Sequence, residues 1–280
     1  MNDHPRFGAG DRPQLAVPVT ALRSLTMLAT GHLAAGEPGL AVALLRAGLL
    51  GTDPRTAAPD LHLADAGAVY AAALDPRGAP DSVALRWARY AYRTGVRWRG
   101  EDHDRTVAAA DVLARVLAAH RVDAQAIDLR RRLVELFTAR DGLVAASTVT
   151  ACVRLAVAEH DAGYCDAGIT GLGRAWQRWS SVHGTADLRS VAMLLDLAAM
   201  LAACGRFAES AHATKQAFAG FAATGPAAAA RPDIPDPLPS WHPAGRNHAA
   251  LCARPRPRPR AGMRRGHRTD RCFACQELLP

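Results

Sequence analysis

The chain repeats a short residue pattern at intervals of 42 residues, and this period limits its fold more than any other feature. Each copy starts with a hydroxyl residue followed by valine, and after five further residues come leucine and a small residue. Three copies align without gaps, starting at Thr106, Thr148 and Ser190. In a helix the valine and the leucine lie on nearly the same face, so both are expected to be buried. We therefore expect the leucines, and the alanines that follow them, to occupy equivalent core positions: Leu113, Leu155 and Leu197, then Ala114, Ala156 and Ala198.

Each copy continues with a turn and a second helical stretch. The turn position and a small residue five places after it are Arg121 and Ala126, Gly163 and Gly168, and Gly205 and Ser210. A glycine at the end of a helix favours a left-handed C-cap, and a small residue lets two helices approach closely. The hydroxyl that opens each copy is expected to cap the first turn of its helix. Each repeat is thus predicted to be a pair of antiparallel helices.

Two weaker copies precede these three. Leu28, Ala29, Gly36 and Ala41 keep the same internal spacings, and Ala84 lies 42 residues before the small residue at position 126. The series predicts five helix pairs in residues 21–222, with turns near positions 36, 75–80, 121, 163 and 205, and almost no strand. Aromatic residues make up only 5% of the chain and alanine supplies much of its apolar fraction, a composition that favours close-packed helices. A non-repetitive helical bundle is the alternative.

This pattern resembles the tetratricopeptide repeat (TPR), and the 42-residue period resembles the longer repeats of kinesin light chains. The resemblance covers residues 21–222. It implies an all-α fold, a right-handed solenoid of about five antiparallel helix pairs, whose first helices line a concave groove that binds a peptide or a partner domain.

The groove positions follow from the alignment of the first helices. They are mostly small or apolar, so an amphipathic helix or an extended apolar segment is the expected ligand. Asp111 and Arg115 lie four residues apart and are equally explained as an ion pair within one helix. The residues predicted to line the peptide-binding groove are Asp111, Arg115, Val153, Val157, Leu195 and Ala199.

No catalytic constellation is recognisable in the sequence. It contains no phosphate-binding loop, dinucleotide fingerprint, nucleophile elbow or His-Glu-x-x-His helix. We therefore predict no catalytic residue, no metal and no cofactor. His103 is interpreted as a structural loop residue. The aromatic pairs Trp87 with Tyr90 and Trp176 with Trp179 are expected to pack between repeats, with a peptide-holding surface as the alternative.

The two ends of the chain differ from the repeats. Residues 221–280 hold ten arginines against four acidic residues, which gives about +6 of the net charge of +8. Ten of the eighteen prolines lie in residues 223–280, so this tail is predicted to be disordered, as is the segment 1–20. Cys272 and Cys275 near its end form a single Cys-x-x-Cys motif, which without a second pair is weak evidence for zinc.

The remaining cysteines, Cys152, Cys165 and Cys204, lie in helical segments at wide spacing, as buried reduced thiols usually do. The sequence has no apolar leader and no apolar run of transmembrane length, so we expect no membrane partner and a cytoplasmic location.

The function predicted first is a non-catalytic protein–protein interaction scaffold, of the kind that serves regulation or signalling. The alternative is a nucleic-acid-associated protein whose basic tail binds polyanions weakly. An enzyme with an unrecognised site ranks below both. The partner and the oligomeric state are not specified by the sequence.

Overall fold

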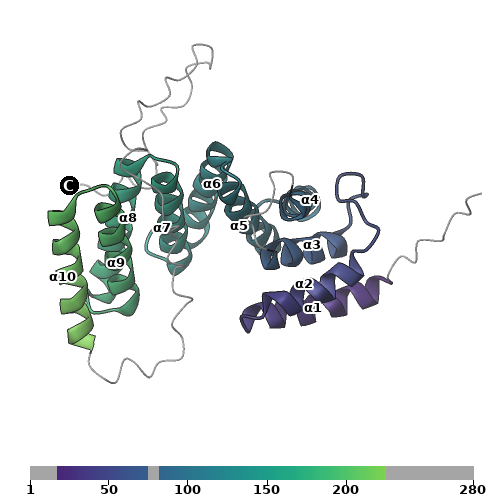
Figure 1. Cartoon of the computed structure of the whole chain (residues 1–280), viewed down its shortest axis with the longest axis horizontal. Helices are drawn as coiled ribbons and strands as arrows, with labels where there is room; N and C mark the ends of the chain where they lie inside the picture. Colours follow the sequence, from purple (N-terminus) through teal and green to yellow (C-terminus); the bar gives the residue numbers. More distant parts are fainter. Residues whose placement is uncertain (1–17, 75–81, 225–280) are drawn as a thin grey trace, which may run out of the picture. The chain divides into compact units, whose positions relative to one another are not determined.

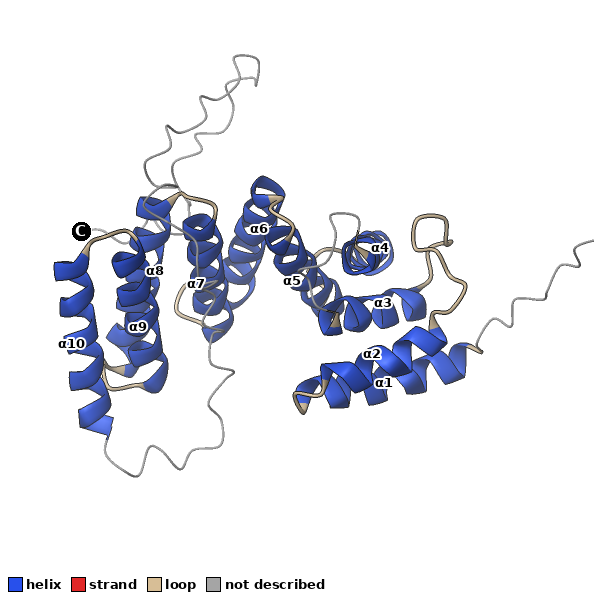
Figure 2. Ribbon diagram, viewed as in Figure 1, coloured by secondary structure: helices blue, strands red, loops and turns tan. Residues whose placement is uncertain are grey.

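The computed structural model describes residues 18–74 and 82–224, and every regular element in them is an α-helix (Figures 1 and 2). The predicted turn at 75–80 and most of the two predicted disordered segments lie outside the described residues. The ends of those segments that are described, 19–20 and 223–224, are helical, so disorder was wrongly predicted for them. The helices fall into two compact units, divided in the sequence between His120 and Arg121, and each unit is described by itself.

The first unit holds five helices: α1 (Val19–Ala34), α2 (Pro38–Gly48), α3 (Leu61–Ala73), α4 (Val83–Arg99) and α5 (Asp104–Ala119). Its core is built largely from small side chains, which let the helices approach closely. A Cβ atom on Gly67 of α3 would lie 2.6 Å from the ring of Trp87 in α4. Trp87 itself is buried, as is Tyr90, one turn further along α4. Both side chains therefore pack within the α3–α4 pair, whereas packing between repeats stays a prediction.

An ion-pair network joins three helices of the first unit. Asp65 of α3 accepts hydrogen bonds from both terminal nitrogens of Arg99 at 2.6 and 2.8 Å, and it also pairs with Arg105 of α5. The side chains of Asp65 and Arg99 are each only 14% exposed. A bidentate pair of this kind fixes orientation as well as distance, so it holds the end of α4 and the start of α5 against α3.

The second unit also holds five helices: α6 (Asp123–Asp141), α7 (Ala146–Asp161), α8 (Cys165–His183), α9 (Leu188–Ala203) and α10 (Phe207–Thr224). One apolar cluster runs through it, with buried residues from all five helices. Trp179 is part of this cluster, and its indole nitrogen donates to the Asp187 carboxylate at 2.6 Å. Trp176 packs against the same cluster, so these tryptophans are packing residues too.

The predicted turns lie where the repeat places them. The backbone φ angle is positive at Gly36, Arg121, Gly163 and Gly205, the left-handed conformation that closes a helix. After α7 the amide of Tyr164 donates to the carbonyl of Glu159 at 2.8 Å, and the two glycine turns at 36 and 205 repeat this bond. Five residues after Gly163, a Cβ atom on Gly168 would lie 2.6 Å from the carbonyl oxygen of Ala156. The prediction of close helix crossings is confirmed there.

The expected role of the repeated hydroxyls is wrong. Thr106, Thr148 and Ser190 are the third residues of their helices, whereas the N-caps are His103, Ala145 and Asp187. The hydroxyls of Thr148 and Ser190 are buried and donate backwards, to the carbonyl oxygens of Gly142 and Gly184 at 2.7 and 2.8 Å. They therefore hold the loop that precedes the helix instead of capping the helix amides.

Candidate functional site

The first helices of two consecutive repeats, α7 and α9, belong to the second unit, in which α8 packs against both of them (Figure 1). Near their N-terminal ends Arg189 of α9 donates to the carbonyl oxygen of Ala146 at 3.5 Å. Near their C-terminal ends the imidazole of His160 is 3.3 Å from the sulfur of Cys204. Residues on the outward side of both helices can therefore act as one surface.

Three of the predicted groove residues are accessible on this surface. Leu195 is 45% exposed. Val157 and Ala199 are half-buried, at positions 42 residues apart. Together they give a surface of small and apolar side chains.

The assignment of Val153 to the groove is wrong. Its side chain is 1% exposed and belongs to the apolar cluster of the second unit. The outward side of α7 passes instead through Arg154, which is exposed. The residue 42 positions later is Asp196, and neither charged residue was assigned to the groove from the sequence. The 42-residue period could have identified both residues, because Arg154 and Asp196 directly follow the predicted groove positions 153 and 195.

Asp196 is a carboxyl group in an unusual environment. Burial raises its pKa to about 6, because a desolvated carboxyl favours its neutral form. Its side chain forms no hydrogen bond or ion pair with the described part of the chain. A half-buried carboxylate on an apolar surface would be stabilised by a cationic group or an N–H donor of a bound molecule.

The other two predicted residues, Asp111 and Arg115, lie on α5 in the first unit. Both are half-buried. Arg115 donates to the carbonyl oxygen of Ala72 at 3.1 Å, near the end of α3. This bond satisfies a carbonyl at a helix C-terminus, so Arg115 helps to pack α5 against α3. His103 has a structural role as well, since its Nδ1 accepts from the backbone amide of Arg105 at 3.2 Å.

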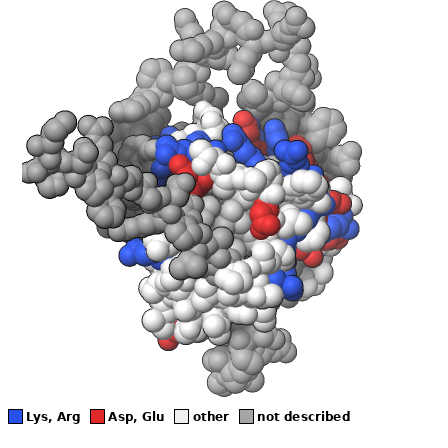
Figure 3. Space-filling view, turned by 90° about the vertical axis from the view of Figure 1, so that its right-hand side faces the viewer, with Lys and Arg blue, Asp and Glu red and all other residues white. Residues whose placement is uncertain are grey.

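The first unit has an open depression of its own, which sequence reasoning did not anticipate. It measures about 340 Å³ and is lined by the loop after α2 together with parts of α3 and α4. Tyr70 and Trp87 are among its lining residues, as are the basic Arg46 and Arg86 and the acidic Asp53. On the face turned toward the viewer in Figure 3, the lower part carries few charged side chains.

None of the helices in the described part of the chain is long and apolar enough to cross a membrane. Cys152, Cys165 and Cys204 are present as thiols, and the first two are buried.

The helix pairs, their turns and their close crossings are those of known repeat structures. A crystal structure of nearly identical TPR-like repeats, from a Podosopora anserina protein assigned as a kinesin light chain, matches 74% of this chain and 98% of its own length, with a TM-score of 0.63 and 19% identity. A point variant of the same protein matches equally well, with a TM-score of 0.63 over 74% of this chain and 97% of its own. The chain has a TPR-like fold.

A third crystal structure is also similar to this chain. BtubC (BKLC) from P. vanneervenii matches 73% of the chain and 81% of its own length, with a TM-score of 0.56 and 21% identity. No protein-family model matches the sequence, and no curated protein sequence matches it either. Sequence identities of 19–21% show that the chain shares the TPR-like solenoid of helix pairs that the repeat predicted. They do not show a shared function, which has to be inferred from the residues of this chain.

Proposed function

We propose that the chain is a non-catalytic protein-interaction scaffold, and that its partner binds to the outward side of α7 and α9. We call this the first-helix surface and define it by Arg154, Val157, Leu195, Asp196 and Ala199. The observation that carries the proposal is the combination of an exposed leucine with a half-buried carboxylate at consecutive positions of α9. Neither residue is stabilised by the fold in this state, and both gain from a bound partner.

The chemistry of the surface describes the partner. Leu195 and the small residues around it would bury apolar side chains, which is the main favourable term in most associations. Asp196 would pair with a lysine, an arginine or a backbone amide of the partner, and pairing removes the cost of leaving a desolvated carboxylate alone. The partner that fits is therefore an apolar helix or extended segment with a basic residue beside its apolar anchor. Absence of catalysis, a regulatory role and a cytoplasmic location belong to the same proposal.

A peptide-display selection against the full chain tests this. Selected peptides should carry apolar residues with a neighbouring lysine or arginine, and Leu195→Glu should weaken them at least tenfold, about 1.4 kcal/mol. Val182 of α8 is a matched control, because it is 57% exposed but lies on a second helix. Val182→Glu should leave the affinity unchanged. Peptides that bind Leu195→Glu and the wild type equally well would place the binding surface elsewhere.

The basic tail supports a second, separate prediction. Its charge favours weak polyanion binding that falls steeply with salt, whereas apolar burial at the first-helix surface is not screened by salt. Deleting residues 223–280 should therefore abolish binding to a short duplex and leave binding of the selected peptides intact.

A further inference from the structure

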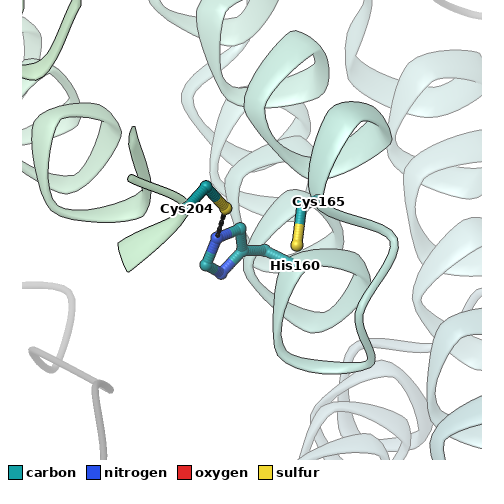
Figure 4. Close-up of side chains that lie close together, drawn as sticks. All are labelled: His160, Cys165 and Cys204. Carbon is teal, nitrogen blue, oxygen red and sulfur yellow. Dashed lines mark hydrogen bonds between the residues drawn. The ribbon is translucent and has the colours of Figure 1, made fainter. Parts of the chain in front are cut away.

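Three side chains with metal-binding atoms come together at one edge of the second unit (Figure 4). His160 lies in the last turn of α7, Cys165 is the first residue of α8, and Cys204 directly follows α9. One atom from each residue, a ring nitrogen or a sulfur, lies within 4.8 Å of the other two. Nε2 of His160 and Sγ of Cys204 are 3.3 Å apart.

The fold explains why these residues meet. The turn at Gly163 reverses the chain between His160 and Cys165, and the turn at Gly205 follows Cys204. Turns of consecutive repeats stack next to each other, so a residue beside one turn lies close to residues beside the next. The cluster therefore links two neighbouring helix pairs, α7–α8 and α9–α10.

The repeat itself does not require these residue types. At the positions 42 residues before His160, Cys165 and Cys204 stand Ala118, Asp123 and Ala162, and 42 residues after the first two stand Ala202 and Phe207. His160 is completely buried. An imidazole inside an apolar cluster is costly unless its polar atoms are engaged, so packing alone would favour the alanine found in the neighbouring copies.

The spacing of the atoms suits a tetrahedral metal ion. In a zinc site with Zn–S bonds near 2.3 Å and Zn–N bonds near 2.0 Å, the ligand atoms lie about 3.5 Å apart for nitrogen and sulfur, and about 3.8 Å for two sulfurs. The 3.3 Å separation of His160 and Cys204 is close to the first value. All three separations are within 4.8 Å, so side-chain adjustments of about 1 Å would complete the geometry.

The helix ends around the cluster are also favourable. His160 and Cys204 lie at the carboxyl ends of α7 and α9, where backbone carbonyls favour a cation. Cys165 lies at the amino end of α8, which favours the negative charge of a ligating thiolate. Cys204 is only half-buried, which leaves a route for the ion and for a water molecule as fourth ligand.

We propose that His160, Cys165 and Cys204 form a binding site for Zn²⁺ that fastens the α7–α8 turn to the α9–α10 turn. Binding replaces the protons of the two thiols: Zn²⁺ and two S–H groups give a zinc dithiolate and two released H⁺. The imidazole nitrogen supplies the third protein ligand. Because the ion bridges two repeats, it stabilises the end of the solenoid that carries the first-helix surface, whether or not that surface binds a partner.

The test uses the full chain with Cys252, Cys272 and Cys275 replaced by serine, so that the tail thiols do not compete. Co²⁺ serves as the optical probe, because thiolate coordination gives it a charge-transfer absorption band. One equivalent of Co²⁺ should produce the band, Zn²⁺ should displace it, and two protons should be released for each zinc bound.

Variants locate the ion. Cys165→Ala, Cys204→Ala and His160→Gln should each weaken binding at least tenfold, while Cys152→Ala should leave it intact. Cys152 is a matched control, because it is a buried thiol of the same apolar cluster but not one of the three. Circular dichroism checks that each variant stays helical.

Two results would overturn the proposal. One is a tail-serine protein that shows no thiolate band with Co²⁺ and no stoichiometric zinc, a measurement that needs no further variant to fold. The other is a band that survives in both Cys165→Ala and Cys204→Ala. Alkylation gives an independent readout, since bound Zn²⁺ should slow the labelling of Cys204 at least tenfold and a site without zinc would show no such protection.

Discussion

The helix pairs α7–α8 and α9–α10 come from consecutive copies of one sequence pattern, yet they are packed differently. In the first pair Gly168 lies so close to the carbonyl oxygen of Ala156 that a Cβ atom would be 2.6 Å from it. In the second pair the equivalent residue is Ser210, whose hydroxyl donates to the carbonyl oxygen of Ala198 at 2.8 Å. The equivalent positions 168 and 210 thus differ in their contacts. Gly168 allows a close helix crossing, whereas Ser210 forms a side-chain hydrogen bond.

The same contrast appears in burial. Val153 of α7 is 1% exposed and its equivalent in α9, Leu195, is 45% exposed. Val153 belongs to the apolar cluster of the second unit, whereas Leu195 lies outside that cluster and is open to solvent. Equal positions of the repeat therefore have the same place on the backbone but different side-chain contacts.

The largest expected effect is on the core leucines of the two pairs. Leu155 is 6% exposed, whereas Leu197 is only half-buried. Leu155→Ala should lower the free energy of unfolding by about 2–5 kcal/mol, the usual range for a buried leucine, and Leu197→Ala by about half as much. Urea unfolding followed by circular dichroism measures both. Equal losses would mean that the two leucines are equally buried and that the comparison fails.

A smaller effect is expected at the close crossing. Gly168→Ala should lower the free energy of unfolding by about 1–3 kcal/mol, because the new methyl group forces the two backbones apart. Gly171 is a matched control on the same helix, since a Cβ atom there would lie 3.4 Å from that of Ala156, an ordinary contact. Gly171→Ala should therefore stabilise the protein by up to about 1 kcal/mol, the gain in helix propensity. If Gly168→Ala also stabilises, α7 and α8 are not as close as described.

The elements that the sequence predicts well are those set by local signals. The turns at Gly163 and Gly205 need only a residue that tolerates positive φ, and Leu-Ala positions at a fixed distance before them identify the helices. The same reasoning placed the turn at Arg121, although arginine adopts positive φ with some strain. Local signals of this kind require no knowledge of neighbouring repeats.

The predictions that failed depend on contacts between repeats. The assignment of Val153 to the groove assumed that equal positions have equal exposure. Asp196 was overlooked because its burial, and with it the raised pKa, comes from the surrounding helices. The meeting of His160 with Cys204 was overlooked for a related reason: the two residues are 44 positions apart, and only the stacking of consecutive turns brings them together.

The smallest expected effect concerns Asp196, whose neighbour Leu195 is exposed while the equivalent Val153 of α7 is buried. Folding raises the pKa of Asp196 from 3.8 to about 6, so the folded state holds a proton that the unfolded state has released. This carboxyl group therefore lowers stability as pH rises from about 4 to about 6, and the loss persists above that range. The full shift corresponds to roughly 3 kcal/mol, and partial solvation reduces it to about 1–2 kcal/mol. Asp196→Asn should thus stabilise the protein at pH 7.5 and leave its stability unchanged below pH 4, as measured by urea unfolding across this range. The same variant should lower the affinity for peptides that carry a lysine or arginine, because the asparagine cannot pair with their charge. A uniform gain at every pH would show that the asparagine acts by packing and that the carboxyl group is not desolvated.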